Sequence, residues 1–407
     1  MREFFKILFF VILIVLLGAC DERIDPNDTI VDLPKNGYIF FNTERATRAE
    51  LEKDKLLKSF NVIGYKYSSS VQGGWTTVKV QAKQNGDMGV FDFIPQMVVY
   101  NSDKKTHSYS NPKEWLPNTR YAFFAWYPTG SESTGLTIGF NNATKDANNN
   151  TISSDNVEGE PYITYTLPTG TDREARKKMY DVMTACNLNY FKEMGVSVPL
   201  EMEHRLAALD IRGMSMINAT ALNEAWWKES PVPVFDVNDE ISVKVTSLSL
   251  SLDPIKASVK IPLNTVIDPY DEDISDQQMV ADGSLFPTYT DFAGGTMKYY
   301  NAEDDIVDLA AADEKLILIP QHDPITATVR VKYEIYCNGK EITEEKLPKG
   351  DDGKPQATFY GEKTVTIDEL NEGVYHYLLI TFTKAGIFVK VAAEKTWAET
   401  DIYYEFN

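Results

Sequence analysis

The strongest constraint in this chain of 407 residues is that apolar side chains recur at every second position, in short runs, along most of its length. Successive side chains of a β-strand point to opposite faces, so a period of two is typical of a strand with one face in a core. Segments rich in Asn, Asp, Gly and Pro separate the runs, as turns do. Runs of this kind lie at 38–43, 60–64, 196–204, 241–252 and 257–263, and the last third of the chain adds more.

Two runs carry further information. Residues 120–128, RYAFFAWYP, are apolar on both alternating faces, which predicts a central strand covered on two sides. The run at 241–252 changes phase near Thr246 and Ser247, which predicts a β-bulge. Helical patterns are confined to two short segments, 172–181 and 219–228. We therefore expect an all-β fold of antiparallel β-sandwiches with few short helices.

The first 20 residues indicate export. A positively charged start precedes an apolar run at 7–17. A helix needs about 20 residues to span a bilayer, so this run is too short for a membrane span and is typical of the apolar core of a signal peptide. It ends at Leu17-Gly18-Ala19-Cys20, the pattern of a bacterial lipobox. We expect removal of residues 1–19 and a lipid anchor on Cys20. The alternative is an ordinary secretory signal with a chance cysteine.

Composition divides the remainder into three parts. Residues 20–36 are polar and punctuated by proline, which predicts an acidic tether. The character of the sequence changes near 190–197, where we place the boundary between an N-terminal sandwich, 37–194, and a C-terminal sandwich, 195–407. After lipidation only Cys186 and Cys337 remain. We expect two buried free thiols, with a disulfide in an oxidising compartment as the alternative.

Charge and motifs argue against several classes of function. The formal net charge is -20, from 40 Lys and Arg against 60 Asp and Glu. Phosphate binding needs a dense cationic face, so we expect no nucleic-acid partner. Sequence motifs for phosphate-binding loops, zinc proteases and nucleophilic serines do not occur. We expect no enzyme, no catalytic residue and no cofactor; a hydrolase built on Asp and Glu pairs would rest on composition alone.

Metal binding is also not expected. The histidines have no metal-like spacing and stand at His107, His204, His322 and His376. His204 continues the apolar face of Val198, Leu200 and Met202, so we expect a hydrogen-bonded core histidine. The acidic stretch at 268–276 offers oxygen ligands for Ca²⁺ but lacks the order of an EF-hand, so a solvated loop is the preferred interpretation.

Six segments, taken in order from residue 17 to about residue 400, carry a resemblance to a known family. Each is weak alone, and the match lies in their order and spacing. They are the lipobox with its acidic tether, YIFFNT with Arg45-Ala46-Thr47-Arg48-Ala49, Trp115-Leu116-Pro117 with YAFFAWYP at 121–128, DVMTA at 181–185 with VPLEMEHRLAAL at 198–209, Leu318-Ile319-Pro320-Gln321, and GVY at 373–375 through ITF at 380–382 to Trp397. Together they resemble the fimbrillin family, the type V pilins of Bacteroidales.

The resemblance implies two tandem transthyretin-like sandwiches that assemble by donor-strand complementation. A lipoprotein at the cell outer membrane is cut by an arginine-specific protease after Arg48, with Arg45 as the alternative. The first strand leaves, and a strand from the next subunit fills the groove, because removal exposes apolar surface and unpaired backbone groups. The removed strand includes Tyr38, Ile39, Phe40 and Phe41.

The candidate donor strand is the segment DIYYEFN, in which Ile402, Tyr404 and Phe406 share one face. The pattern leaves open whether this segment donates to a neighbour or closes its own domain. The implied partners are other fimbrial subunits, the protease, outer-membrane lipid through the acyl anchor, and host or bacterial surface ligands. The mature location is an extracellular fimbrium. The cleavage site argues against an uncleaved anchor subunit, and the long region 268–305 favours an accessory or tip subunit over a stem subunit.

A surface glycan-binding lipoprotein is the competing interpretation. It shares the lipid anchor, and it would use exposed aromatic rings as a platform for sugars. Trp226 and Trp227, close to Pro231, are the candidates for that platform. The remaining tryptophans lie beside alternating runs and are expected in the core, at Trp75, Trp115, Trp126 and Trp397.

Overall fold

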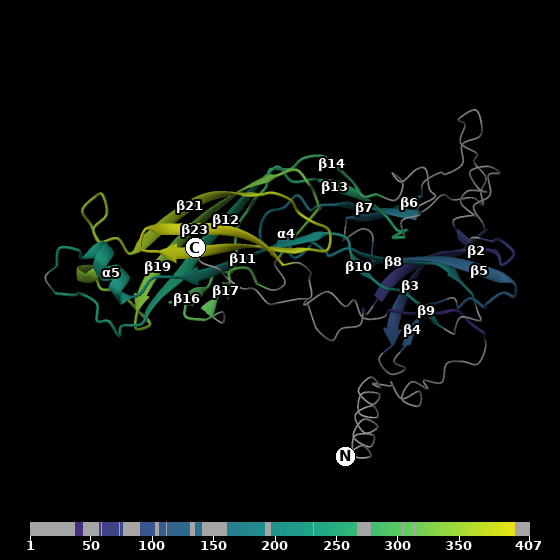
Figure 1. The fold of residues 1–407 in the computed structure, drawn as a ribbon, viewed down its shortest axis with the longest axis horizontal. Coiled ribbons are helices and arrows are strands. Elements are labelled where there is room, and N and C mark those ends of the chain that lie inside the picture. The colour runs from purple at the N-terminus through teal and green to yellow at the C-terminus, as the bar shows by residue number, and fades with distance from the viewer. Residues whose placement is uncertain are drawn as a thin grey trace, which may run out of the picture.

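In the computed structural model, the described residues are 37–43, 57, 59–72, 74–75, 90–101, 106–110, 112–130, 135–140, 161–191, 197–230, 232–266, 278–302, 305–311 and 315–394. Strands dominate these residues, which confirms the all-β prediction (Figure 1). The short helices α4 (Arg173–Arg176) and α5 (Ala219–Trp226) lie within the two predicted helical segments. Each begins after a capping side chain, because the Asp172 and Asn218 side chains accept hydrogen bonds from the N–H groups of Ala175 and Ala221. A 3-10 turn, η5 (Glu344–Lys346), lies beside α5, where Trp227 Nε1 donates to Lys346 O.

A six-stranded antiparallel sheet forms one end of the molecule (Figure 1, right). Its strands, in spatial order, are β10 (Glu203–His204), β8 (Met183–Tyr190), β5 (Thr119–Tyr127), β2 (Ser59–Ser68), β3 (Val90–Asn101) and β4 (Thr106–Ser108). A separate two-stranded sheet, β1 (Phe40–Asn42) with β9 (Ser197–Pro199), packs on one face of this sheet.

Strand β5 confirms the prediction of a central strand covered on two sides. It pairs with β2 on one edge and with β8 on the other. Its side chains divide between two cores: Phe124 and Trp126 face the larger one, whereas Tyr121 and Phe123 face the smaller one beneath β1. A strand buried on both faces needs apolar residues at consecutive positions, which is why its sequence shows no polar alternation.

A four-stranded sheet joins the two parts of the chain. Its order is β14 (Val280–Asp282), β13 (Ser258–Pro262), β7 (Pro161–Thr166) and β6 (Leu136–Phe140), all antiparallel. Strands β6 and β7 precede residue 194, and β13 and β14 follow it. The boundary near 194 stays a prediction, but backbone pairing crosses it.

Two further sheets face each other across the larger core, the same one that Phe124 and Trp126 of β5 face. The first contains β11 (Ala207–Ser215), β17 (Val307–Asp308), β18 (Leu316–Leu318), β22 (Tyr375–Thr383) and β23 (Gly386–Glu394). The second contains β12 (Ile241–Asp253), β15 (Thr288–Tyr289), β16 (Thr296–Lys298), β19 (Ile325–Cys337), β20 (Lys340–Glu341) and β21 (Thr358–Ile367).

The register of β12 confirms the predicted bulge, because its pairing with β19 shifts between Val245 and Ser247. Two pairs depart from the antiparallel pattern: β1 with β9, and β11 with β22, are parallel. The strands of each parallel pair are far apart in sequence, so no hairpin constrains their direction.

Both remaining cysteines are free, as expected, although each is half-buried and not fully buried. The Cys186 Sγ lies 3.2 Å from the Thr265 hydroxyl oxygen. Burial raises the pKa of the Cys337 thiol.

Candidate functional site: the seat of the first strand

The first strand occupies a seat formed by Tyr109, residues 113–115, strand β9 and the face of β5 below it; we call this the β1 seat. On one edge, the chain around β1 runs antiparallel to residues 113–115. Ile39 N donates to Lys113 O at 2.7 Å, and Trp115 N donates to Gly37 O at 2.8 Å. These bonds fix the first half of the strand.

The other edge of β1 is paired as well. Phe40 and Asn42 stand opposite Ser197 and Pro199 in the parallel pairing with β9. Leu200 N donates to Asn42 O at 2.8 Å. Because both edges have partners, β1 behaves as an inner strand although only three residues carry regular strand geometry.

Alternate side chains of β1 anchor it in the smaller core. Ile39, Phe41 and Thr43 point inward and are 0%, 3% and 3% exposed. The Phe41 ring meets the edges of Phe123 and Phe60, with centroids at 5.2 Å and 6.5 Å. Full burial of an aliphatic or aromatic side chain contributes about 1.5–3 kcal/mol of stability, so Ile39 and Phe41 are the main apolar anchors of the strand.

A tyrosine that sequence reasoning did not single out clamps the strand from the side. The Tyr109 hydroxyl donates to Ile39 O at 2.9 Å and accepts from Lys113 N at 3.1 Å. Its ring packs against Phe41 with centroids 5.8 Å apart. Seventy residues separate Tyr109 from Ile39, and no local pattern marks such a contact.

The seat has supports that do not depend on β1. The Tyr190 hydroxyl donates to Ser197 O at 2.7 Å, and the Asn187 side-chain amide donates to Pro199 O at 3.3 Å. Both donors lie on β8, so they hold β9 against the six-stranded sheet. The Trp115 ring packs on Tyr121 of β5, with centroids 5.3 Å apart.

Two buried polar atoms at the seat are not satisfied. Among the residues that the structure describes, neither Thr43 Oγ1 nor Trp115 Nε1 has a hydrogen-bond partner. Trp115 lies beside Gly37, three residues before β1, and Thr43 directly follows β1. A buried polar group without a partner costs about 1–3 kcal/mol, so these two atoms lower the stability of the region around β1.

The predicted removed strand therefore lies entirely within this seat, with Ile39 and Phe41 buried and Tyr38 and Phe40 half-buried. The other predicted site residues lie outside the described part of the chain, as does the acidic stretch 268–276. They are the lipidation site Cys20, the cleavage candidates Arg45 and Arg48, and the donor-strand residues Ile402, Tyr404 and Phe406.

The histidines occupy separate environments. His204 is buried and its Nδ1 meets the Asp181 carboxylate, which confirms a hydrogen-bonded core histidine. Burial lowers the pKa of His107, whose Nε2 lies 2.9 Å from Leu57 O, and it lowers the pKa of His376 to about 4. His322 is exposed. Within the described ranges, no three His, Cys, Asp or Glu side chains gather as a metal site would require.

The tryptophan pair considered as a sugar platform is engaged in packing. The Trp226 ring stacks on Phe359 with centroids 5.4 Å apart, and Trp227 Nε1 donates to Lys346 O at 3.3 Å. Trp75, Trp115 and Trp126 are buried as expected, and Trp397 lies outside the described residues.

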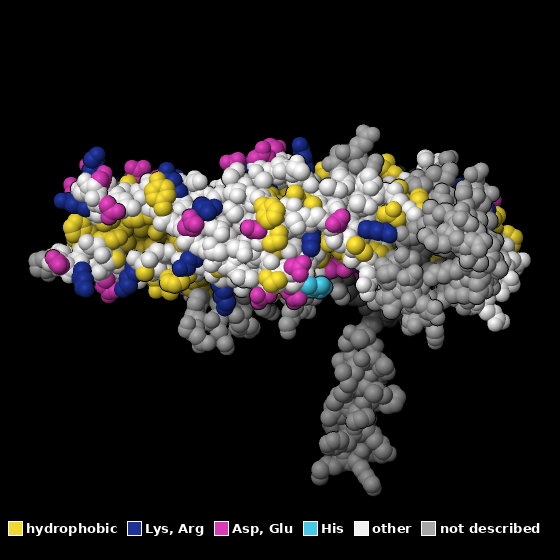
Figure 2. Space-filling view, turned by 90° about the horizontal axis from the view of Figure 1, so that it is seen from above, with side chains coloured by type: hydrophobic (Ala, Val, Ile, Leu, Met, Phe, Trp, Pro, Cys, Tyr) yellow, Lys and Arg dark blue, Asp and Glu magenta, His cyan; other side chains and the backbone are white. Residues whose placement is uncertain are grey.

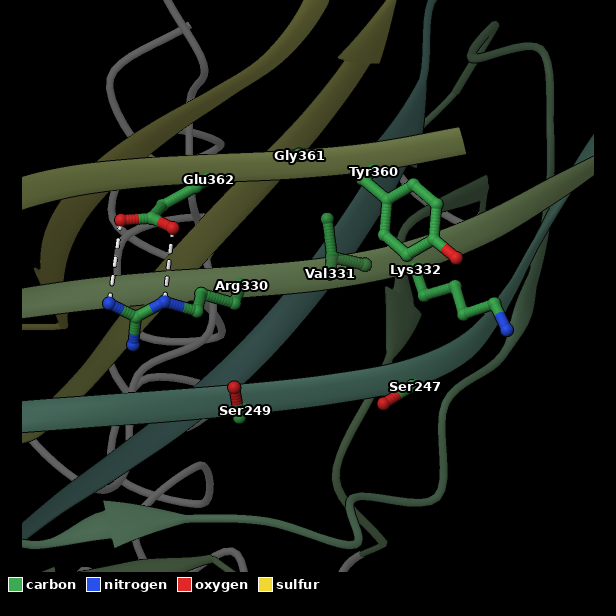
Figure 3. A pocket seen from close by; sticks show the side chains of 8 residues that line it. All are labelled: Ser247, Ser249, Arg330, Val331, Lys332, Tyr360, Gly361 and Glu362. Atoms are coloured by element: carbon green, nitrogen blue, oxygen red, sulfur yellow. Dashed lines mark hydrogen bonds and ion pairs between the residues drawn. The ribbon is translucent and has the colours of Figure 1, made fainter. Parts of the chain in front are cut away.

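An exposed aromatic ring does stand elsewhere, on the outer face of β12, β19 and β21 (Figure 3). Tyr360 is 73% exposed there, beside an open depression of about 420 Å³. Arg330 and Glu362 form a two-bond ion pair in the same depression, at 3.0 and 3.4 Å, and Ser247 and Ser249 line its other side.

For the part of the chain with described coordinates, no helix is long and apolar enough to cross a membrane. No family model and no curated protein sequence matches the chain. Among solved structures, the chain is similar to a fimbrial protein from Bacteroides vulgatus, with 16% identity over 89% of this chain and 100% of that one and a TM-score of 0.53.

Two further structures show lower similarity. A candidate cell adhesion protein from Bacteroides uniformis is 10% identical, with 89% and 98% of the two chains covered and a TM-score of 0.39. A candidate adhesin from Bacteroides thetaiotaomicron is 8% identical, with 88% and 95% covered and a TM-score of 0.38. The likeness to the Bacteroides vulgatus protein shows a shared fold.

Proposed function

We propose that this chain is a non-enzymatic subunit of cell-surface fimbriae and a member of the fimbrillin family. It is acylated at Cys20 and anchored in the cell outer membrane until an arginine-specific protease cuts after Arg48, or after Arg45. A strand from the next subunit then takes the place of β1. The fold shared with the fimbrial protein from Bacteroides vulgatus supports this proposal.

The observation that carries the proposal is the construction of the β1 seat. Loss of β1 would leave Lys113 O, Trp115 N and Leu200 N without their present partners. It would also expose the rings that contact Phe41. Unpaired backbone groups and apolar surface together make a strand-binding groove. A replacement strand would pair those groups and bury that surface, so its binding to the vacated seat is favourable.

Digestion of the full exported chain, with Cys20→Ser to keep it free of lipid, tests the cleavage. We expect an arginine-specific protease to cut at Arg48, with a new N-terminus at Ala49, and native gels to show oligomers only after the cut. Arg48→Lys is the matched control because it keeps the charge and removes the recognised side chain. Cutting that never yields oligomers would contradict the proposed assembly. A new N-terminus at Ala46 in the parent chain, unchanged in Arg48→Lys, would reassign the site to Arg45.

Glycan binding is the second candidate function, and Tyr360 is the observation that favours it. An exposed ring flanked by an ion pair and hydroxyl groups offers a stacking face and polar contacts to a sugar. Binding to a polysaccharide panel that disappears in Tyr360→Ala, and persists in Tyr336→Phe on the neighbouring strand β19, would support it. Unchanged binding in Tyr360→Ala would mean that the depression beside Tyr360 is not a glycan-binding site.

A further inference from the structure

The depression beside Tyr360 lies on the outer face of β12, β19 and β21, and the bulge in β12 sets which side chains line it (Figure 3). Because the register shifts between Val245 and Ser247, Leu248 faces the core and the serines on either side of it face outward. The short serine side chains leave a space that the longer side chains of β19 and β21 border. Two rows of cross-strand neighbours result, one of Tyr360, Lys332 and Ser247, the other of Glu362, Arg330 and Ser249.

Arg330 and Glu362 form a fixed and electrically neutral part of this surface. Besides its two bonds to the Glu362 carboxylate, Arg330 donates from Nη1 to the Ser251 hydroxyl at 3.2 Å. Three contacts hold the guanidinium in one place, and a bidentate pair of arginine and carboxylate is a strong form of ion pair. The pair therefore gives the depression oriented polar atoms and adds no net charge.

Lys332 supplies a positive charge that no described carboxylate compensates. Its Nζ lies 5.9 Å from the centroid of the Tyr360 ring, and no ion pair or hydrogen bond joins the ammonium to another described residue. Glu334, the next outward-facing residue of β19, stands opposite Lys244. The depression therefore carries one excess positive charge, next to its aromatic ring.

Tyr360 and the two serines offer the contacts that a sugar needs. An exposed aromatic ring alone is common on protein surfaces. This ring is 73% exposed at the border of the depression, in which no hydrogen bond to another described residue engages the hydroxyls of Ser247 and Ser249. A pyranose ring has an apolar face that lies well on an aromatic ring, and the hydroxyl groups around its rim pair with polar side chains.

We propose that this depression binds an acidic glycan, with one sugar ring stacked on Tyr360 and its carboxylate beside the Lys332 ammonium. Figure 3 shows the side chains of Tyr360 and Lys332 extending toward the same end of the depression, so one sugar can contact both. Its hydroxyl groups then lie within reach of Ser247 and Ser249. This inference rests on the glycan-binding candidate above, and it adds the charge of the ligand and the residue that selects for it.

The net charge of the chain makes the proposal specific. With a formal charge of -20, the molecule repels a polyanion at long range and does not adsorb one unspecifically. At physiological ionic strength this repulsion is screened beyond about 8 Å, so an ammonium in direct contact with a carboxylate still attracts it. Binding of an acidic glycan would therefore report a local cationic site.

Calorimetric titration of the full exported chain, with Cys20→Ser, against matched glycans tests the proposal. The probes are polygalacturonate, alginate and hyaluronate, each compared with its carboxyl-reduced neutral form. We expect an acidic form to bind about fivefold more tightly than its neutral counterpart, the factor that about 1 kcal/mol from one exposed ion pair supplies. Raising the salt concentration should reduce this preference, because salt screens the ion pair.

Two variants with the same change in charge locate the preference. Lys332→Gln should bind the acidic and neutral forms equally and keep the affinity for the neutral form. Lys363→Gln is the matched control and should keep the preference, because the Lys363 ammonium lies outside the depression, 5.9 Å from the centroid of the Phe388 ring. Tyr360→Ala should lose binding to both forms.

The outcomes separate this inference from the function on which it rests. If no probe binds, the glycan-binding candidate fails and the inference fails with it. If the neutral forms bind as tightly as the acidic forms, or if Lys332→Gln keeps the preference, glycan binding stands and the acidic ligand is overturned. If Lys363→Gln loses the preference as well, the effect follows net charge and the assignment to Lys332 is wrong.

Discussion

Tyr109 is the residue on which the attachment of β1 depends most specifically. Its hydroxyl joins Ile39 O to Lys113 N, so Tyr109→Phe removes two hydrogen bonds in a buried site. We expect a loss of about 1–3 kcal/mol in the free energy of unfolding, measured by denaturant titration. Tyr360→Phe, on an exposed ring, should stay within about 0.5 kcal/mol of the parent. Equal stability of the two variants would mean that the two Tyr109 hydrogen bonds contribute nothing to the free energy of unfolding.

His376 gives the molecule a pH dependence. Burial lowers its pKa to about 4, partly opposed by Glu369, and its Nε2 accepts a hydrogen bond from Asn371 N at 3.2 Å, which requires the neutral ring. A lowered folded-state pKa stabilises the protein above the unfolded value of about 6.5. That stability is lost as pH falls from about 6.5 toward 4.

Unfolding measured between pH 7 and pH 4 tests this prediction. His376→Asn should flatten the pH dependence, whereas His322→Asn, at an exposed histidine, should leave it unchanged. His107 shifts in the same direction, so part of the slope will remain in His376→Asn. An identical slope in the parent and in His376→Asn would contradict the assignment.

Single residues also show how far sequence reasoning reaches. His204 could be predicted as a core histidine because it continues an apolar alternation next to Met202. Tyr109 could not, because its contact with Ile39 depends on how two distant segments cross. Thr43 Oγ1 and Trp115 Nε1 lack hydrogen-bond partners within the described residues, and this is likewise a property of packing that no local pattern encodes.

At the scale of elements, β1 depends on a few buried side chains. Phe41→Ala removes a ring that contacts three other rings, so we expect a loss of about 3–5 kcal/mol in the free energy of unfolding and loosening of the strand. Asn42→Ala, on the exposed side of the same strand, serves as the matched control. If the 44–48 region resists proteolysis equally in both variants, Phe41 does not anchor β1 in its seat.

Alternation predicted individual strands better than it predicted their partners. The doubly apolar run of β5 and the phase change in β12 were sufficient to predict a central strand and a bulge. The parallel pairs of β1 with β9 and of β11 with β22 were not predicted. Period two fixes which face of a strand is buried, but it carries no information about the direction of a distant neighbour.

At the scale of the whole molecule, the sheet that contains β7 and β13 ties the two parts of the chain together. We therefore expect one cooperative unfolding transition by calorimetry. Thr164→Pro, in the centre of β7 with partners on both sides, should split or broaden that transition because proline removes a ladder hydrogen bond. Thr164→Val keeps the strand and is the control. Two separate transitions in the parent protein would show that this sheet does not couple the parts.

The surface of the molecule is consistent with association through strands. Acidic and basic side chains are interspersed over the described part of the face in Figure 2, and the chain carries a formal net charge of -20. Copies of such a chain repel one another at long range. In the proposed assembly, attraction between subunits must therefore come from short-range contacts, and the β1 seat offers backbone pairing together with apolar burial.

Amide hydrogen exchange at Trp115 and Leu200 reports directly whether β1 leaves its seat, because their N–H groups donate to Gly37 O, just before β1, and to Asn42 O in β1. We expect strong protection in the uncleaved chain, loss of protection in cleaved and dispersed subunits, and renewed protection in assembled ones. Protection that is unchanged by cleavage would mean that β1 never leaves. Assembly without renewed protection would mean that subunits join elsewhere.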